Sequence, residues 1–199
     1  MDARPKRREV LAGALAAAGA AVGLEFTPGS SALADSTPSD AELLSKTLKV
    51  ERLMVLAYER VLASDALSAG VRGAITPFLG QEREHVSAVA GQLSRLGAPA
   101  PTAPLSPKEA SDALDEHHVS GSLTDLRTEH DCLKLLVDLE SVAEGAAYTP
   151  IRHVRRPELV TLCAQIMACE AQHWTVLSGL RNPGQYVKAI PWPFVFGSS

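Results

Sequence analysis

Glu82-Arg-Glu-His85 and Glu170-Ala-Gln-His173 are two copies of the pattern Glu-x-x-His. On an α-helix, residues three apart lie on one face, so each copy places a carboxylate beside an imidazole. The apolar residues spaced helically around the copies are Ile75, Phe78, Val89, Leu93 and Leu96, and Leu159, Cys163, Ile166, Leu177 and Leu180. This spacing predicts faces that pack against other helices. Because a buried carboxylate is costly unless it is paired or bound to a metal ion, the two copies indicate a shared metal site.

Two more glutamates, Glu51 and Glu140, also lie within apolar helical stripes. Each precedes a Glu-x-x-His by about thirty residues. In an antiparallel helical hairpin, residues equidistant from the turn lie level with each other. With turns near residues 64–70 and at Arg155, Glu51 lies level with Glu82, and Glu140 with Glu170. The spacing therefore predicts four carboxylates and two imidazoles at one level of a helical bundle.

This ligand set suits iron or manganese better than copper or structural zinc, because it is rich in oxygen and has two nitrogens. Four carboxylates also balance the charge of two divalent ions, which removes the cost of burying each glutamate alone. Neighbouring glutamates leave alternatives open. Glu144 lies one helical turn from Glu140 and could replace or assist it, and Glu59 is a weaker rival of Glu51. We expect Glu84 to face solvent.

Residues 41–181, with their ordered Glu, Glu-x-x-His, Glu and Glu-x-x-His, resemble the ferritin-like superfamily of di-metal carboxylate proteins. They are more closely similar to the exported bacterial ferritin-like domain proteins. The chain lacks the Cys-rich segment of rubrerythrins and the fifth helix of ferritins. The resemblance implies two iron ions, or alternatively manganese, as cofactors. It implies the metal ligands Glu51, Glu82, His85, Glu140, Glu170 and His173.

The resemblance also implies redox chemistry with dioxygen or peroxide, of the ferroxidase, peroxidase or oxidase type. The alternative that it leaves open is a non-catalytic envelope or stress protein in which the metal is structural or absent. No catalytic residue is predicted beyond the metal ligands. Tyr58 and Tyr148 follow the lone glutamates at similar distances. Either could hydrogen-bond a ligand carboxylate or relay an electron, and core packing explains them equally well.

The remaining cysteines and histidines show no ligand spacing. The three cysteines are expected to be free thiols, and Cys169 to point away from the site as an inert buried residue. We interpret the four other histidines as surface residues: His117, His118, His130 and His153.

The expected fold is all-α, an antiparallel four-helix bundle. Helices are predicted over 41–64, from between Ala69 and Pro77 to Leu96, from Thr124 to Tyr148 or beyond Pro150, and over 157–181. The span between the second and third helices is long enough to cross the length of the bundle, and it holds a short helix near 107–117. After Arg181, an apolar tail interrupted by prolines is predicted to form an extended strap.

Composition supports one bundle domain and excludes some partners. The chain has 199 residues, of which 46% are hydrophobic and 5% aromatic, and its formal net charge is −4. Apart from Arg152, Arg155 and Arg156, no basic cluster lies beyond the first ten residues, which argues against nucleic-acid binding. An Ala-rich bundle of this kind could form a homodimer.

The N-terminus resembles a twin-arginine export signal. Arg7-Arg8 is followed by an apolar Ala/Gly-rich stretch at 10–24 and by Ala32-Leu-Ala34, which suits a signal peptidase. The predicted organisation is a signal peptide at 1–34, a linker at 35–40 and a ferritin-like domain at 41–199. We expect export to the periplasm, the cell envelope or the exterior, with no membrane span after cleavage.

Overall fold

The structure is a computed structural model that describes residues 38–190. Within this range the chain forms five α-helices, one short 3-10 helix and no strand, which confirms the all-α prediction. The predicted signal peptide and the first half of the linker, residues 35–37, lie outside the described residues. The helices are α1 (Asp40–Ala63), α2 (Ala69–Arg95), α3 (Pro107–Glu116), α4 (Glu129–His153), α5 (Pro157–Arg181) and the 3-10 helix η1 (Tyr186–Ala189).

Side-chain caps set where most helices begin. Ser39 caps α1, Ser68 caps α2 and Ser106 caps α3, each by accepting a hydrogen bond from a backbone N–H of the first turn. Thr128 caps α4, which therefore begins later than the predicted Thr124. The prediction failed there because Ser122 binds the backbone N–H groups of residues 124 and 125 and holds them in a turn.

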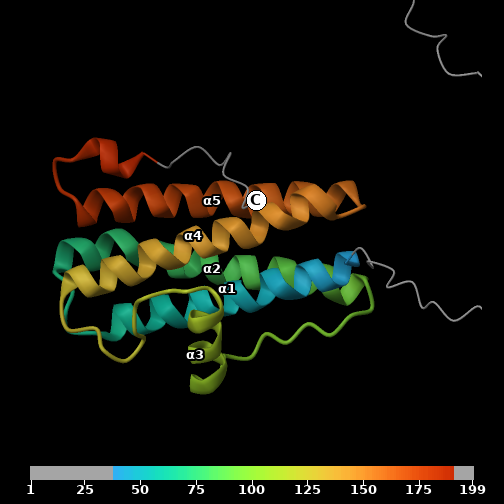
Figure 1. The fold of residues 1–199 in the computed structure, drawn as a ribbon, viewed down its shortest axis with the longest axis horizontal. Coiled ribbons are helices and arrows are strands. Elements are labelled where there is room, and N and C mark those ends of the chain that lie inside the picture. The colour runs from blue at the N-terminus through green and yellow to red at the C-terminus, as the bar shows by residue number, and fades with distance from the viewer. Residues whose placement is uncertain (1–37, 191–199) are drawn as a thin grey trace, which may run out of the picture. The chain divides into compact units, whose positions relative to one another are not determined.

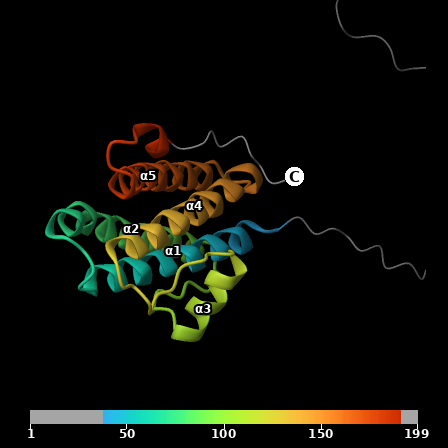
Figure 2. The same ribbon diagram turned by 60° about the vertical axis from the view of Figure 1, so that its left-hand side comes forward.

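The long helices form two hairpins, α1 with α2 and α4 with α5, joined mainly through α1 and α4 (Figures 1 and 2). The packing is uneven: α4 packs most extensively on α5, whereas α2 and α5 share few contacts. Figure 1 shows the connection from α2 to α4 running along the bundle from the end of one helix to the start of the other. The four long helices thus place their buried faces around one interior.

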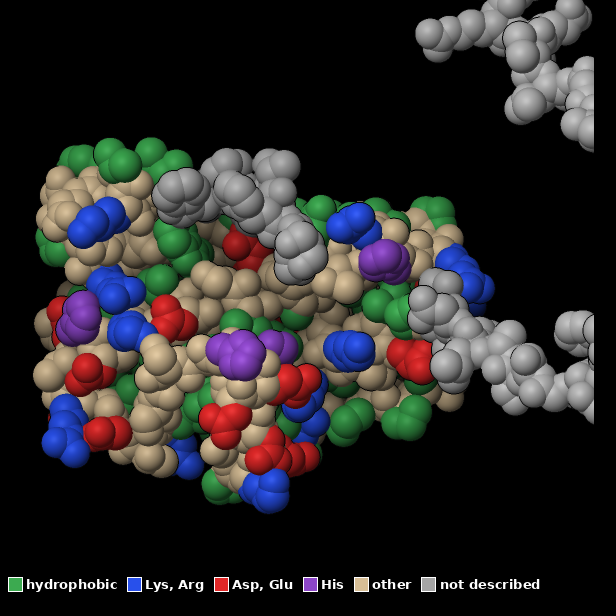
Figure 3. All heavy atoms as spheres, in the orientation of Figure 1, with side chains coloured by type: hydrophobic (Ala, Val, Ile, Leu, Met, Phe, Trp, Pro, Cys, Tyr) green, Lys and Arg blue, Asp and Glu red, His purple; other side chains and the backbone are tan. Residues whose placement is uncertain are grey.

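The connection between α2 and α4 is held to α1 by α3 and its flanks. Lys49 pairs with Glu116 at 2.6 Å, and the Arg52 side chain donates a hydrogen bond of 2.9 Å to the carbonyl of Ala103. Leu105 and Leu114 of this segment are buried in the apolar core of the bundle. Acidic side chains gather on the outer surface of α3 (Figure 3), so its apolar face alone is left to pack on the bundle.

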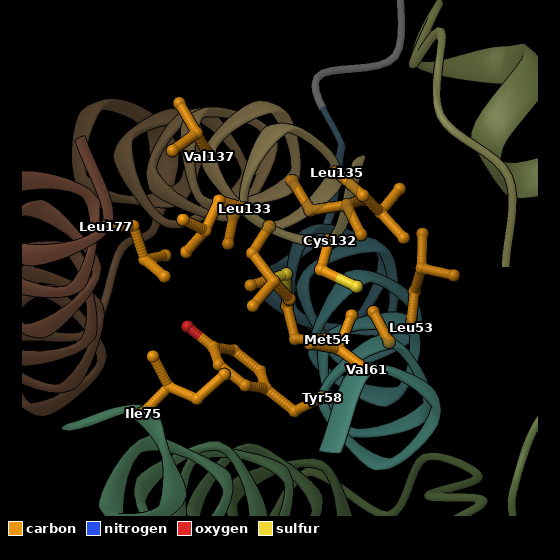
Figure 4. Packing of buried hydrophobic residues seen from close by; sticks show 14 of the residues in the cluster. Leu53, Met54, Tyr58, Val61, Ile75, Cys132, Leu133, Leu135, Val137 and Leu177 are labelled. Carbon is orange, nitrogen blue, oxygen red and sulfur yellow. The ribbon is translucent and has the colours of Figure 1, made fainter. Parts of the chain in front are cut away.

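Two apolar clusters fill the interior. One contains Leu44, Val89 and Ile166, and the other contains Leu53, Leu136 and Leu177. Figure 4 shows part of the second cluster, with the Tyr58 hydroxyl directed into the space between the helices. The glutamates of the candidate site lie along the helices between these clusters, so they are surrounded by apolar packing at both ends.

The described part of the C-terminal tail differs from the predicted extended strap. After α5, Gly184 adopts a positive φ of 76° and the chain turns into η1. No residue of η1 is buried, and Tyr186 and Val187 are each 83% exposed. The rest of the predicted strap, residues 191–199, lies outside the described residues. Among the helices that the structure describes, none is long and apolar enough to cross a membrane.

Candidate metal centre

Six side chains from four helices converge inside the bundle. Glu51 comes from α1, Glu140 from α4, and the two Glu-x-x-His pairs from α2 and α5. All four glutamates are 0% exposed, while His85 is 9% and His173 is 2% exposed. The hairpin register that sequence spacing predicts is what brings these residues to one level. The six are Glu51, Glu82, His85, Glu140, Glu170 and His173.

The imidazole of His85 faces three carboxylates through one nitrogen. Its Nδ1 lies 2.8 Å from a Glu170 oxygen, 3.3 Å from a Glu51 oxygen and 3.5 Å from a Glu82 oxygen. The carboxylates come from three helices, so His85 sits at the convergence of α1, α2 and α5.

The imidazole of His173 mirrors this arrangement from α5. Its Nδ1 lies 3.0 Å from a Glu82 oxygen, 3.4 Å from a Glu170 oxygen and 3.5 Å from a Glu140 oxygen. In both histidines the Nδ1 atom faces the carboxylates, which leaves Nε2 on the outer side of each ring.

The donor atoms fall into two overlapping groups, each with its atoms within 4.8 Å of one another. We call the group of Glu51, Glu82, His85 and Glu170 position A, and the group of Glu82, Glu140, Glu170 and His173 position B. Glu82 and Glu170 belong to both positions. Two carboxylates shared between two donor sets are the arrangement that a pair of bridged metal ions requires.

The donor atoms lack protein partners, which tests whether the site fits metal ions. Both oxygens of Glu51, Glu82 and Glu170, one oxygen of Glu140, and the Nδ1 of both histidines are buried without a hydrogen-bond partner. Buried polar atoms are almost always hydrogen-bonded, so a concentration of unpartnered ones indicates a missing ligand. Because every one of these atoms can donate an electron pair to a cation, the residues fit a pair of divalent metal ions.

The pKa values of the metal-free cluster also indicate a site that needs positive charge. Burial and the charges of Glu170 and Glu82 raise the pKa of Glu51 to about 8, and burial raises that of Glu140 well above its usual value. Burial opposes the ionisation of Glu170, but the two imidazoles beside its carboxylate lower its pKa to about 2. Burial also opposes the charging of His85, but the Cys169 thiol and the glutamates around the ring raise its pKa. Without metal, protons take the place of positive charge in the cluster.

Three outer groups hold ligand side chains in place. The Tyr58 hydroxyl, which is fully buried, donates a hydrogen bond to Oε1 of Glu140. Gln81 Oε1 lies 2.7 Å from Nε2 of His173. The ring of Phe78 stacks on His173 with centroids 4.1 Å apart and an angle of 21° between the planes. These contacts restrict the rotation of two of the six side chains.

The alternatives left open by the sequence belong to neither donor group. Glu59 pairs with Arg83 at 2.8 Å outside the cluster. Glu144 is half-buried with one unpartnered oxygen, and burial and the charge of Glu170 raise its pKa to about 7, but it belongs to neither position. Tyr148 is half-buried, with the Arg152 guanidinium 6.0 Å from its ring centroid. Glu84 is exposed.

Sequence reasoning misplaced Cys169 and missed Gln81. All three cysteines are free, as expected. However, Cys169 does not point away from the site: its Sγ lies 3.5 Å from Nε2 of His173. The two residues are four apart on α5 and share a face, a spacing that could have indicated the contact. No such local signal exists for Gln81, because its partner lies on another helix.

In the comparison with protein families, residues 39–183 match the family described as Ferritin-like domain. Curated proteins and solved structures give no match. The matched range contains all four long helices and all six clustered side chains. The fold, the site and this match agree, and the chain belongs to the ferritin-like domain family.

Proposed function

We propose that this chain binds two divalent metal ions, iron or alternatively manganese, and carries out redox chemistry with dioxygen or peroxide. The carrying observation is the set of buried, unpartnered oxygen and Nδ1 atoms at positions A and B. The family membership supports a metal pair, and the oxygen-rich donor set with one imidazole at each position favours iron or manganese.

Bound metal ions of this kind supply electrons to dioxygen or peroxide, a reaction that protein side chains do not perform alone. The chain contributes the setting. Glu82 and Glu170 belong to both donor groups and would be available to either ion, and the four carboxylates would balance the charge of the pair. The apolar clusters on both sides keep bulk water from the donor atoms. The Tyr58 hydroxyl donates to Glu140 and holds that carboxylate in one orientation.

The class of reaction is ferroxidase, peroxidase or oxidase. The donor set supports all three, since they differ in which molecule gives electrons to the metal pair and not in the ligands. The assay therefore compares iron, peroxide and small reductants as substrates.

The test is a metal count followed by an oxidation assay. The chain from residue 35 is purified, and bound metals are measured by elemental analysis before and after loading with ferrous iron under nitrogen. Air or peroxide is then added, and the rates of iron oxidation and oxidant consumption are recorded. Two metals per chain with oxidant consumption faster than in a protein-free blank supports the proposal. Two metals that raise thermal stability without any such rate would favour the structural-metal alternative, and no uptake would refute metal binding.

We also propose that the chain is exported through its twin-arginine-type N-terminus and cleaved after Ala34. Support comes from the sequence alone: Arg7-Arg8, the apolar stretch at 10–24 and small residues before the cleavage point. The expected result is a mature protein outside the cytoplasm whose N-terminal residue is Asp35. Replacing both arginines by lysine should retain the uncleaved chain in the cytoplasm, and unchanged export of that variant would refute the proposal.

A further inference from the structure

Gln81 touches the candidate metal centre from outside. The residue is exposed on α2, immediately before Glu82, and its Oε1 lies 2.7 Å from Nε2 of His173 on α5. The opposite nitrogen of that ring, Nδ1, faces the carboxylates of position B. The His173 ring is therefore held between an amide on one side and the donor cluster on the other.

An amide oxygen only accepts hydrogen bonds, so this contact requires a proton on Nε2 of His173. In a neutral imidazole, a proton on Nε2 leaves the lone pair on Nδ1, the atom that faces the cluster. The opposite tautomer would place a proton on Nδ1 and block metal coordination there. The carbonyl of Gln81 thus selects the tautomer that can bind a metal ion.

The same contact selects one orientation of the ring. Turning the His173 ring over by half a turn would bring a carbon in place of Nε2 opposite Gln81 and lose the hydrogen bond. Phe78, stacked at 4.1 Å, limits tilting of the ring but not this turn, because stacking does not distinguish the two ring edges. The contact also spans α2 and α5, which share few packing contacts.

We propose that Gln81 is a positioning residue that sets the tautomer and orientation of His173 and so strengthens metal binding at position B. This inference rests on the proposed metal binding. Its effect is confined to one position because the second Glu-x-x-His has a different preceding residue. Cys169 stands immediately before Glu170, as Gln81 stands before Glu82, and a thiol is a much weaker acceptor than an amide oxygen.

The experiment compares zinc binding in the wild-type chain with that in Gln81→Leu, Gln81→Glu and Gln172→Leu. Leucine removes the acceptor, whereas glutamate keeps it. Gln172 is a matched control: it is an exposed glutamine next to His173, and its amide donates to the carbonyl of Ala168 on its own helix. Zinc is titrated against a competing chelator, and the histidine N–H groups of the zinc-loaded proteins are observed by nitrogen-15 NMR.

We expect Gln81→Leu to weaken one of the two zinc sites by about 10- to 100-fold and to leave the other unchanged, as measured for lost partners of metal-bound histidines. The Nε2–H signal of His173 should shift in this variant to that of a weakly bonded N–H, because only the Cys169 thiol, 3.5 Å away, is left beside Nε2. It should stay at the wild-type position in Gln81→Glu and Gln172→Leu. Gln81→Glu should restore the affinity.

Equal zinc affinities and an unchanged His173 signal in Gln81→Leu would overturn the positioning role, and so would equal weakening of both sites. These two outcomes are interpreted only when the wild-type chain binds two zinc ions. A wild-type chain that binds neither zinc here nor iron or manganese in the metal count would instead refute the proposed function, which keeps the two failures distinct. Matching circular dichroism of the metal-free proteins checks that each variant folds.

Discussion

Replacing a shared carboxylate should have a larger effect than replacing an unshared one. Glu82 belongs to both donor groups, whereas Glu51 belongs only to position A and Glu140 only to position B. We therefore expect Glu82→Gln to lose both metals, and Glu51→Gln and Glu140→Gln to lose one each. Glutamine keeps the size of the side chain, so the substitution tests the charge and the donor oxygen and not the packing.

The expected shift in melting temperature on metal binding follows from the linkage between binding and folding. Metal at a thousandfold excess over its dissociation constant stabilises the folded chain by about 4 kcal/mol for each site. For a domain of this size, each kcal/mol shifts the melting temperature by about 2 to 4 °C. Wild type should then gain about 16 to 32 °C on loading both positions. Glu51→Gln should gain about half of that, and Glu82→Gln close to none.

The assay is a thermal melt with and without manganese, paired with elemental analysis of the same samples. Glu51 is a good position for this substitution because its pKa of about 8 keeps the side chain mostly protonated, and therefore uncharged like glutamine, in the metal-free wild type at neutral pH. Its glutamine variant should therefore melt near wild type without metal. If Glu82→Gln kept half of the metal-induced shift, or Glu51→Gln lost all of it, the assignment of shared and unshared ligands would be wrong.

Three other predictions concern the metal-free chain. Tyr58→Phe removes the donor to the buried Glu140 and should cost about 1 to 3 kcal/mol in urea denaturation; no change would mean the bond is not stabilising. Raising the pH from 6 to 9 should destabilise the wild type by about 2 to 3 kcal/mol. The reason is that Glu51, whose pKa is raised to about 8 in the folded chain, loses its stabilising proton over this range. Glu51→Gln should lose less stability in the same denaturation series. Gly121→Ala would bring a Cβ within 2.6 Å of Leu135 Cδ1 and should lower stability by about 1 to 3 kcal/mol in thermal melts, unless Leu135 shifts freely.

The sequence predicts most of the architecture because glutamates inside apolar helical stripes are rare and informative. The stripes place Glu51 and Glu82 at one level, and the turn positions follow from capping and breaking residues. The predicted α5, 157–181, agrees with the observed Pro157–Arg181 because proline at its start and Asn182-Pro183-Gly184 at its end are strong signals. Helix periodicity depends on residues close together in the chain, so helix positions and ends can be predicted from the sequence alone.

What the sequence did not predict depends on contacts between helices. Gln81 reads as an ordinary exposed residue on α2, and only the approach of α5 brings its amide to His173. The prediction for Cys169 was wrong because the side chain diverges from its neighbour Glu170 but shares a helix face with His173, four residues on. Tyr58 and Tyr148 occupy similar places in the sequence pattern, yet only Tyr58 reaches a glutamate of the site. Side-chain direction across a helix pair cannot be read from spacing alone.

The division of donors between the two hairpins has a consequence for assembly. Position A takes three residues from the α1/α2 hairpin and only Glu170 from the other; position B takes three from α4/α5 and only Glu82 from the first. Neither hairpin alone can complete a coordination set, so a misdocked chain offers each cation one donor too few. Metal retention would thus distinguish correctly assembled chains from misassembled ones. A chelator would selectively weaken the association of the two hairpins.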